Sequence, residues 1–491
     1  MYYPCWYSGL ICLLFLLTSG LAHLLCSSRG KRFIFSRSYG ISYNSHQKLK
    51  RTSCAPLFGA DKGTDLVPTD TSVNLDEIGN DLEVPPPKDG ITKIVMKFGG
   101  SSVSNAERVT YVAKLIKKHI DLGYTPIIVV SAMGKTTNSL LSSGDSALNG
   151  EVYIESLRNL HLTTARTLSL EKETIEDIEN ILNDLEKLLN GVKMLGELSP
   201  RTKDALVSFG ERMSVRIMAA TLTKMGVNAQ AFDAWNLGMR TTSEFGNAEI
   251  VESTYEHMKN NLAKYDWQIV PVVTGFIGHD DRGLITTLGR GGSDLTASVL
   301  GAAAPAQEIQ VWKDVDGILT TDPRIAKAAR PVGVVTYEEA AEMAYFGAEV
   351  LHPIAMNPAT RSKIPMRVKN SYNPEAEGTL ITFNRDKSDS LVTVITAKSS
   401  VRLVDIVSTR MLGQYGFLGK VFAAFDKWKI SVDVVASSEV SLSLTLDEKQ
   451  AEKTETLKGL IRDLGEFSDV QVFEIYAPDL LTFNVFLCHS L

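Results

Sequence analysis

A lysine, two glycines and two serines follow one another within the segment ITKIVMKFGGSSV, residues 91–103. Lys97 ends a short apolar run that is typical of a buried strand, and Gly99, Gly100 and Ser101 come directly after it. Glycines let the backbone approach a phosphate group closely, and a lysine adds a positive charge within reach. These residue types suit phosphoryl transfer, although a lysine that ends a strand before any tight turn would look the same.

A second glycine-rich segment, TTLGRGGSDLTAS at residues 286–298, opens a predicted helix. It does not fit the dinucleotide fingerprint G-x-G-x-x-G that starts at Gly289, because Asp294 occupies the place of the last glycine. Arg290 can hold a carboxylate through two hydrogen bonds, and Asp294 can hold an ammonium group. The segment therefore carries groups that could bind an amino acid, although each of them could also be a solvated loop charge.

Hydroxyl side chains gather in the segment SAMGKTTN, residues 131–138, which follows another predicted strand. Its GKTT sequence resembles part of a Walker motif, but that motif needs a glycine five residues before Gly134, where Val129 stands. The Walker interpretation is therefore excluded. The segment is instead a strand-to-loop turn rich in hydroxyl groups, which suits contact with a polar substrate.

A single carboxylate, Glu211, lies in SFGERMSVR, at what the pattern predicts to be the start of an apolar helix. A buried carboxylate is costly unless it meets a cation, and the ammonium group of an amino acid would serve. The alternative is an ordinary glutamate that interacts favourably with the helix dipole.

Charged residues are dense in VWKDVDGILTTDPRI, residues 311–325. They could meet nucleotide phosphates, the ribose and Mg²⁺, or each could be a solvated loop charge. The residues concerned are Lys313, Asp314, Asp316, Asp322 and Arg324.

Predicted strands and helices alternate along the central part of the chain. Strands are predicted at 93–98, 125–132, 227–232, 268–276 and 308–314, helices at 104–123, 204–226 and 293–304, and a polar, largely helical insert at about 145–200. This alternation predicts an α/β sandwich around a mostly parallel sheet. Ligands bind such sheets beyond the carboxyl ends of the strands, where the glycine-rich turns fall.

Composition narrows the class of protein. The 491 residues are 44% hydrophobic and 22% charged, which is an ordinary globular mixture, and the length predicts two or three domains. A formal net charge of −6 argues against a nucleic-acid binder. No cysteine occurs at 55–487, so the folded body has neither a disulfide framework nor a cysteine metal site.

The first ninety residues differ from the rest. Residues 1–60 contain no Asp or Glu and are basic and Ser-rich from Arg29 onward, which is typical of a cleaved transit segment. The apolar stretch at 10–26 is interrupted by polar residues, so no stable membrane association is expected, although it could also be a signal-peptide core or follow from a wrong gene start. Residues 61–90 are acidic and Pro-rich and are predicted to be a linker.

Five segments in this order resemble aspartate kinase of the amino-acid kinase superfamily: KFGGSSV, SFGERMS, TTLGRGGSDLTA, VWKDVDGILTTDPR and FGAEVLHP. The resemblance covers about residues 93–447, and it implies a catalytic domain of that fold at 91–385. It also implies Mg²⁺-dependent transfer of phosphate from ATP to the side-chain carboxylate of L-aspartate. The product, 4-phospho-L-aspartate, would start the synthesis of lysine, threonine, methionine and isoleucine.

The resemblance also implies roles for individual residues. Lys97 would contact the transferring phosphate, and Asp294 would orient Lys97 and the substrate amine. Contacts to ATP are implied for Lys97, Gly99, Gly100, Ser101, Ser131, Lys313, Asp314 and Arg324, and contacts to aspartate for Thr137, Glu211 and Arg290. No protein ligand to a metal is implied.

Three positions depart from the pattern of many bacterial members. Glu349 replaces a lysine, Leu319 replaces a tyrosine and Lys313 replaces a threonine. All three changes concern nucleotide binding.

The C-terminal part, residues 386–491, resembles an ACT regulatory domain. A strand is predicted at 391–397, a helix at 416–429 and two further strands at 430–439 and 440–447, in βαββ order. The resemblance implies feedback control by lysine, with S-adenosylmethionine as a second effector, acting on a two-state equilibrium of a homodimer.

The remaining residues are too few for the second ACT domain of the family, so we expect an incomplete one. Such a sheet would expose edge strands and apolar side chains such as Phe483, Val485 and Phe486, and would impair allostery, dimerisation or solubility. We also expect no homoserine dehydrogenase region.

Two alternatives remain beside the aspartate kinase. One is a glutamate or acetylglutamate kinase of the same fold, which the ACT-like region and SFGERMS disfavour. The other is a non-catalytic amino-acid sensor or an impaired isoform, which the intact Lys97, Arg290 and Asp294 disfavour. The basic N-terminal segment and the implied pathway together predict the plastid stroma.

Overall fold

The computed structural model describes residues 92–345, 351–385, 392–398, 400–408, 415–432, 434–447, 454–476 and 482–487. The predicted transit segment and linker, and Glu349, lie outside these ranges. Within the described ranges, no helix combines the length and the apolar character needed to cross a membrane.

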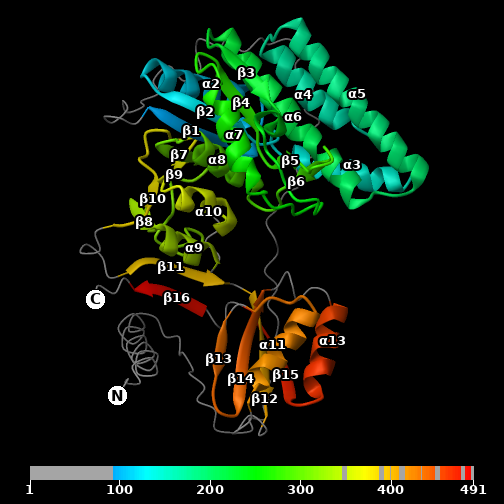
Figure 1. The fold of residues 1–491 in the computed structure, drawn as a ribbon, viewed down its shortest axis with the longest axis vertical. Coiled ribbons are helices and arrows are strands. Elements are labelled where there is room, and N and C mark those ends of the chain that lie inside the picture. The colour runs from blue at the N-terminus through cyan, green and yellow to red at the C-terminus, as the bar shows by residue number, and fades with distance from the viewer. Residues whose placement is uncertain are drawn as a thin grey trace, which may run out of the picture. The chain divides into compact units, whose positions relative to one another are not determined.

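An eight-stranded sheet forms the centre of residues 92–385 (Figure 1). Its order is β3 (Ala229–Phe232), β4 (Val270–Thr274), β2 (Thr125–Val130), β1 (Lys93–Phe98), β7 (Glu308–Lys313), β9 (Met366–Asn370), β10 (Thr379–Thr382) and β8 (Val334–Thr336). Every neighbouring pair in this sheet is parallel except β9 and β10. The prediction of a mostly parallel sheet is confirmed.

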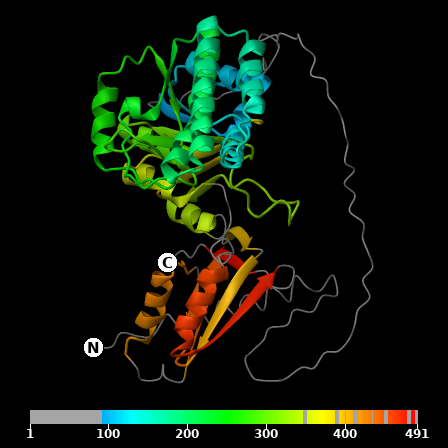
Figure 2. The ribbon, with the colours of Figure 1, turned by 90° about the vertical axis from the view of Figure 1, so that its right-hand side faces the viewer.

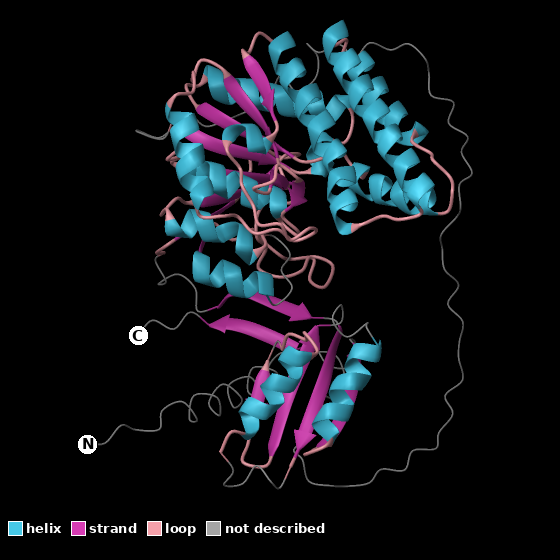
Figure 3. Ribbon diagram, turned by 45° about the vertical axis from the view of Figure 1, so that its right-hand side comes forward, coloured by secondary structure: helices cyan, strands magenta, loops and turns pink. Residues whose placement is uncertain are grey.

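Helices cover both faces of this sheet (Figure 3). One apolar core joins the sheet to α2 (Ala106–Asp121), α3 (Thr136–Leu148), α4 (Glu155–Thr167), α5 (Lys172–Leu195) and α6 (Pro200–Lys224). The other core joins it to α7 (Ser253–Ala263), α8 (Gly292–Ala303), α9 (Tyr337–Tyr345) and α10 (Pro353–Arg361). The molecule therefore has the predicted αβα layers.

Strand β1 divides its side chains between the two cores. Ile94, Met96 and Phe98 belong to the first core, whereas Val95 belongs to the second. Because successive side chains in a strand point to opposite faces, Lys97 must point toward the second core, where α8 lies. The strand period alone thus fixes which helix the lysine meets.

Helix α6 begins earlier than the sequence pattern predicted. Ser199 caps it, its Oγ accepting a hydrogen bond from the Thr202 N–H at 3.2 Å, and Pro200 is the first helical residue. Glu211 therefore lies three turns inside the helix rather than at its start, and the interpretation of Glu211 as a helix-dipole residue is wrong. The Ser-Pro pair was the signal that marked the true start.

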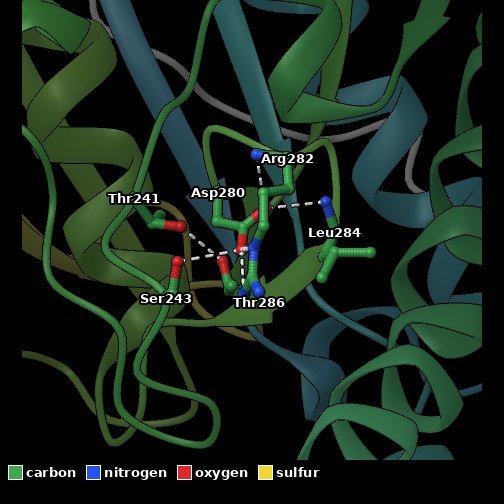
Figure 4. A network of polar contacts seen from close by, with 6 residues as sticks. All are labelled: Thr241, Ser243, Asp280, Arg282, Leu284 and Thr286. Atoms are coloured by element: carbon green, nitrogen blue, oxygen red, sulfur yellow. Dashed lines mark hydrogen bonds and ion pairs between the residues drawn. The ribbon is translucent and has the colours of Figure 1, made fainter.

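A small hairpin leads into the second glycine-rich segment. Its strands are β5 (Ile277–His279) and β6 (Ile285–Thr287), and the buried carboxylate of Asp280 organises the turn between them (Figure 4). This carboxylate accepts hydrogen bonds from the N–H groups of Arg282 and Leu284 and pairs with the Arg282 guanidinium at 2.8 Å. Burial by itself would raise the pKa of Asp280, but these donors outweigh it and lower the pKa to about 2.

Short 3-10 helices complete the description of residues 92–385. They are η2 (Gly100–Val103), directly after β1, and η3 (Ala234–Leu237), after β3.

In its described residues, the C-terminal part forms a four-stranded antiparallel sheet with two helices (Figure 2). In chain order the elements are β12 (Ser400–Val407), α11 (Phe417–Lys427), β13 (Val435–Ser437), β14 (Ser441–Asp447), α13 (Thr454–Gly465) and β15 (Asp469–Tyr476). Phe417, Val421 and Phe425 of α11 are buried, and α11 lies within the helix predicted at 416–429. The order is therefore βαββαβ, in which α13 and β15 follow the two strands predicted at 430–439 and 440–447.

The strand predicted at 391–397 does not belong to this sheet. It is β11 (Val392–Lys398), which pairs with β16 (Thr482–Leu487) in a separate two-stranded sheet. The first strand of the four-stranded sheet is β12, which the sequence pattern missed because two apolar runs stand side by side there. The side chains of Phe483, Val485 and Phe486 lie outside the described residues.

Two helical glycines of the C-terminal part should respond oppositely to an added methyl group. A Cβ on Gly459 would come within 2.3 Å of the Trp428 ring, whereas one on Gly419 would meet nothing within 4 Å. We expect Gly459→Ala to lower the free energy of unfolding by about 1–3 kcal/mol through overpacking. Gly419→Ala should raise it by up to about 1 kcal/mol through helix propensity. Urea denaturation of both variants tests this, and equal effects would contradict the packing described.

Candidate active site

A pocket of about 310 Å³ lies at the carboxyl ends of the central parallel strands. The turns after β1, β2 and β4, helix α6 and the start of α8 supply its walls. The lining residues are Lys97, Gly100, Ser131, Ala132, Gly134, Thr137, Glu211, Phe276, Gly289, Gly291, Gly292, Ser293 and Asp294. The pocket is therefore at the edge of the sheet where parallel α/β folds bind ligands.

An ion pair joins the strand β1 to the helix α8 across this pocket. Lys97 Nζ lies 2.6 Å from Asp294 Oδ1, and Lys313 Nζ lies 3.7 Å from Asp294 Oδ2. Burial by itself would raise the pKa of Asp294, but the two lysine charges outweigh it and hold the pKa below its ordinary value. The aspartate is thus charged, and two cations face a single anion.

The first turn of α8 presents its backbone toward the pocket. The helix starts after Gly291, whose φ of 73° is in the left-handed region, and no described side chain caps it. A Cβ on Gly291 would come within 2.7 Å of the His352 Cβ, so both conformation and space require glycine here. Uncapped N–H groups at a helix start favour an anion.

The turns after β1 and β2 touch backbone to backbone. The Gly134 N–H donates to the Gly100 carbonyl at 2.9 Å, and a Cβ on Gly100 would come within 2.7 Å of the Ala132 carbonyl oxygen. A side chain at residue 100 would force the two turns apart. Glycine here therefore keeps the pocket floor free of side chains.

Glu211 is fully buried at one wall of the pocket. Its Oε1 accepts a hydrogen bond from the Ala132 N–H at 3.3 Å, while its Oε2 has no hydrogen-bond partner among the described residues. Burial raises the pKa of Glu211 to about 8, and the Ala132 hydrogen bond offsets this only in part. A buried carboxylate oxygen without a partner beside a pocket suits an ammonium ligand.

The structure brings together most of the residues singled out from the sequence. Lys97, Gly100, Ser131, Thr137, Glu211 and Asp294 line one pocket, and Gly99 and Ser101 belong to the turn after β1. Arg290 is exposed between two pocket glycines. Asp314 is exposed directly after β7 and Arg324 pairs with Asp322 at 2.7 Å, so neither lines the pocket.

Ser293 and Phe276 are among the pocket residues that the sequence analysis did not single out. Ser293 accepts a hydrogen bond from Ser131 Oγ at 2.9 Å, and Phe276 adopts a φ of 69° that is unusual for a non-glycine residue. Ser293 lies inside the glycine-rich segment and could have been found there. No sequence signal marked Phe276, because its conformation depends on the chain around it.

Two family models match this chain. Residues 92–370 match the amino acid kinase family, and residues 404–456 match an ACT domain.

Curated relatives and solved structures agree with these matches. The chain is 50% identical over 397 residues to aspartokinase 2, chloroplastic, of Arabidopsis thaliana. This match covers 77% of this chain and 72% of that protein. It is 54% identical over 364 residues to aspartokinase 3, chloroplastic, of the same plant, and that match covers 72% of this chain and 64% of the relative. The chain thus spans roughly two thirds of the length of these relatives.

Among solved structures, aspartokinase III of Escherichia coli in complex with aspartate and ADP (R-state) is similar at a TM-score of 0.66. The two are 34% identical, and the match covers 78% of this chain and 85% of that one. The same enzyme in complex with lysine and aspartate (T-state) gives a TM-score of 0.63.

The raised pKa of Glu211 makes the ligand-free protein less stable as pH rises. In the unfolded chain this carboxyl ionises near its ordinary value of 4.5, whereas in the folded protein it keeps its proton up to about pH 8. Between these values unfolding releases a proton, so a higher pH favours unfolding. Glu211→Gln has no such carboxyl group. We therefore expect its free energy of unfolding, relative to that of the wild type, to rise by about 1.4 kcal/mol per pH unit from pH 5 to pH 8.

Urea denaturation without ligand at pH 5, 6, 7 and 8 measures this gain. The exposed Glu173→Gln on α5 is the matched control, and its difference from the wild type should stay constant. If the difference in free energy of unfolding between Glu211→Gln and the wild type also stayed constant with pH, the raised pKa of the buried Glu211 would be contradicted.

Proposed function

The chain belongs to the aspartokinase family of amino acid kinases, and we propose that it transfers the γ-phosphoryl group of ATP to the side-chain carboxylate of L-aspartate. The single observation that carries this proposal is the pocket in which Lys97, Asp294 and Glu211 meet. One wall offers positive charge for a phosphate, and the other offers a buried carboxylate for an ammonium group. The product is 4-phospho-L-aspartate.

In this proposal the reaction is catalysed by positive charge and by backbone N–H groups that no side chain covers. The attacking carboxylate of aspartate is already ionised at neutral pH, so no general base is needed. Lys97 and the turn at Gly99, Gly100 and Ser101 hold the transferring phosphoryl group and balance its negative charge. Catalysis is then positioning and electrostatic stabilisation.

The substrate side of the pocket recognises an α-amino acid. Glu211, together with Asp294, binds the ammonium group, and Arg290 binds the α-carboxylate in two hydrogen bonds. Thr137 lines the same pocket and contacts the substrate through its hydroxyl. The E. coli relative solved with aspartate and ADP supports this substrate.

The nucleotide is proposed to contact Ser131 and the segment that follows β7, through Asp314 and Arg324. In the described part of the chain no group of three or more His, Cys, Asp or Glu side chains gathers as a metal site. The lysines and glycine turns would hold the phosphates of a nucleotide that brings its own Mg²⁺, and the ion would supply further positive charge against the charge of the transferring group.

A hydroxamate assay decides between the three candidate functions. With ATP, Mg²⁺, hydroxylamine and L-aspartate, the wild type should form aspartyl hydroxamate, while glutamate and acetylglutamate should give no product. No hydroxamate from any of them, with an active full-length relative as positive control, would favour the non-catalytic sensor.

Lys97→Ala should lower kcat in this assay by about 10²- to 10³-fold or more, because the charge at the transferring phosphate is lost. Lys117→Ala on α2, at a partly exposed lysine far from the pocket residues in sequence, should keep the wild-type rate, and circular dichroism shows whether each variant is folded. Wild-type turnover by Lys97→Ala would remove the proposed role of this lysine.

We further propose that the region 386–491 regulates the kinase at 91–385 in a homodimer. The match to an ACT domain and the E. coli relative solved with lysine support lysine as the effector, with S-adenosylmethionine as a second candidate. The chloroplastic relatives support a plastid location. In this proposal residues 1–60 are a cleaved targeting segment, and residues 61–90 link it to the kinase. The product would enter lysine, threonine, methionine and isoleucine synthesis.

Lysine should therefore inhibit turnover of the intact chain, whereas threonine at equal concentration should not. Coupling between two sites is typically about 5- to 150-fold in affinity, so lysine should raise the apparent KM for aspartate by at least about 5-fold. Steady-state rates with either amino acid titrated against aspartate measure this. A flat response to lysine would show that the ACT-like part of this chain does not sense it.

A further inference from the structure

Two lysines from neighbouring strands hold the same buried carboxylate. Lys97 is the second-last residue of β1 and Lys313 is the last residue of β7, and each has its Nζ near a different oxygen of Asp294, at 2.6 and 3.7 Å. The side chains of Lys97, Asp294 and Lys313 are 9%, 7% and 23% exposed. The cluster is thus largely shielded from water.

The sheet register places both lysines on the same side. Strands β1 and β7 are parallel neighbours in which Lys97 lies beside Val311. Paired residues of adjacent strands point to the same face, and Lys313 follows Val311 by two residues, so Lys313 also points toward α8. Gly99 lies near this cluster, and a Cβ on it would be 3.8 Å from Lys97 Nζ.

The charges of this cluster become unbalanced when Lys97 acts on a phosphoryl group. In the ligand-free structure Lys97 is committed to Asp294 at 2.6 Å. Its attraction to a phosphoryl group would loosen that pair and leave a buried aspartate without its closest cation, which is strongly unfavourable. Lys313 is the second cation within reach of the same carboxylate and can tighten its contact.

We propose that Lys313 is a positioning residue that keeps Asp294 charged and in place while Lys97 turns to the transferring phosphoryl group. This inference rests on the proposed kinase function. In this role Lys313 affects the reaction by holding the Asp294 carboxylate, and the effect does not depend on a contact with the nucleotide. Burial lowers the pKa of Lys313, but Asp294 and Asp314 oppose that shift, which fits a lysine retained as a counter-ion.

A double-mutant cycle separates this role from simple nucleotide binding. The hydroxamate assay is run on Lys313→Met, Asp294→Asn and the double variant, with kcat and both KM values determined. We expect Lys313→Met to lower kcat by up to about 10²-fold while the KM values for ATP and aspartate stay within about twofold. In the Asp294→Asn background the same change should alter kcat by no more than about twofold, because Lys313 then has no carboxylate to hold.

Lys313→Arg should restore most of the activity, since a guanidinium can hold the same carboxylate. The exposed Lys172→Met on α5 is the matched control and should keep wild-type kinetics. Calorimetric binding of Mg-ADP gives a readout independent of turnover, and its Kd should change by less than about twofold in Lys313→Met. If Lys313→Met does not fold by circular dichroism, Lys313→Gln replaces it in every arm.

Several outcomes would overturn the inference. A loss that appears only in the KM for ATP and in the Kd of Mg-ADP would make Lys313 a nucleotide contact alone. Equal losses with and without Asp294→Asn would show that Lys313 acts independently of the aspartate. Wild-type kinetics of Lys313→Met would show that Lys97 needs no second cation. An inactive wild type would instead refute the proposed function, so the two failures are distinguishable.

Discussion

The buried carboxylate of Asp294 is the constraint on which the candidate site depends. It is placed in the first turn of α8, and it draws Lys97 from the middle of the sheet and Lys313 from the adjacent strand. An aspartate this deep remains ionised only because two cations lie beside it. The arrangement of β1, β7 and α8 therefore has to bring these three side chains together, and the parallel register of the two strands does so.

Close backbone packing is the second requirement of the pocket. The turns after β1 and β2 meet at Gly100 and Gly134, and α8 starts at glycines that pack against neighbouring side chains. A phosphate group needs N–H donors at short range, which only an unobstructed backbone can offer. Ordering these glycines on folding costs more conformational entropy than ordering other residues, but it leaves the backbone N–H groups accessible to a ligand. The packing of the surrounding cores holds the glycines in place.

Glu211 shows how such a site keeps an unfavourable group. Its carboxylate lies inside the longest helix of the first core, where burial favours the protonated form. The helix is anchored by apolar residues on several sides, including Leu206, Met213 and Val215, so the fold tolerates the cost. A cationic ligand would relieve it, which links substrate binding to the ionisation of this residue.

The sequence by itself determined the fold class, the alternation of strands and helices, and most residues of the pocket. These features follow from local signals: hydrophobic period, glycine-rich turns and the types of charged residue at strand ends. The sequence pattern predicted the start of α6 too late. It also missed β12, because it could not tell which of two adjacent apolar runs pairs in which sheet. Tertiary structure alone decided that Lys97 and Lys313 share one carboxylate, that Glu211 loses its solvent and that Phe276 enters the pocket. Those facts depend on contacts between segments as far apart as residues 97 and 294, and such contacts leave no local periodicity to read.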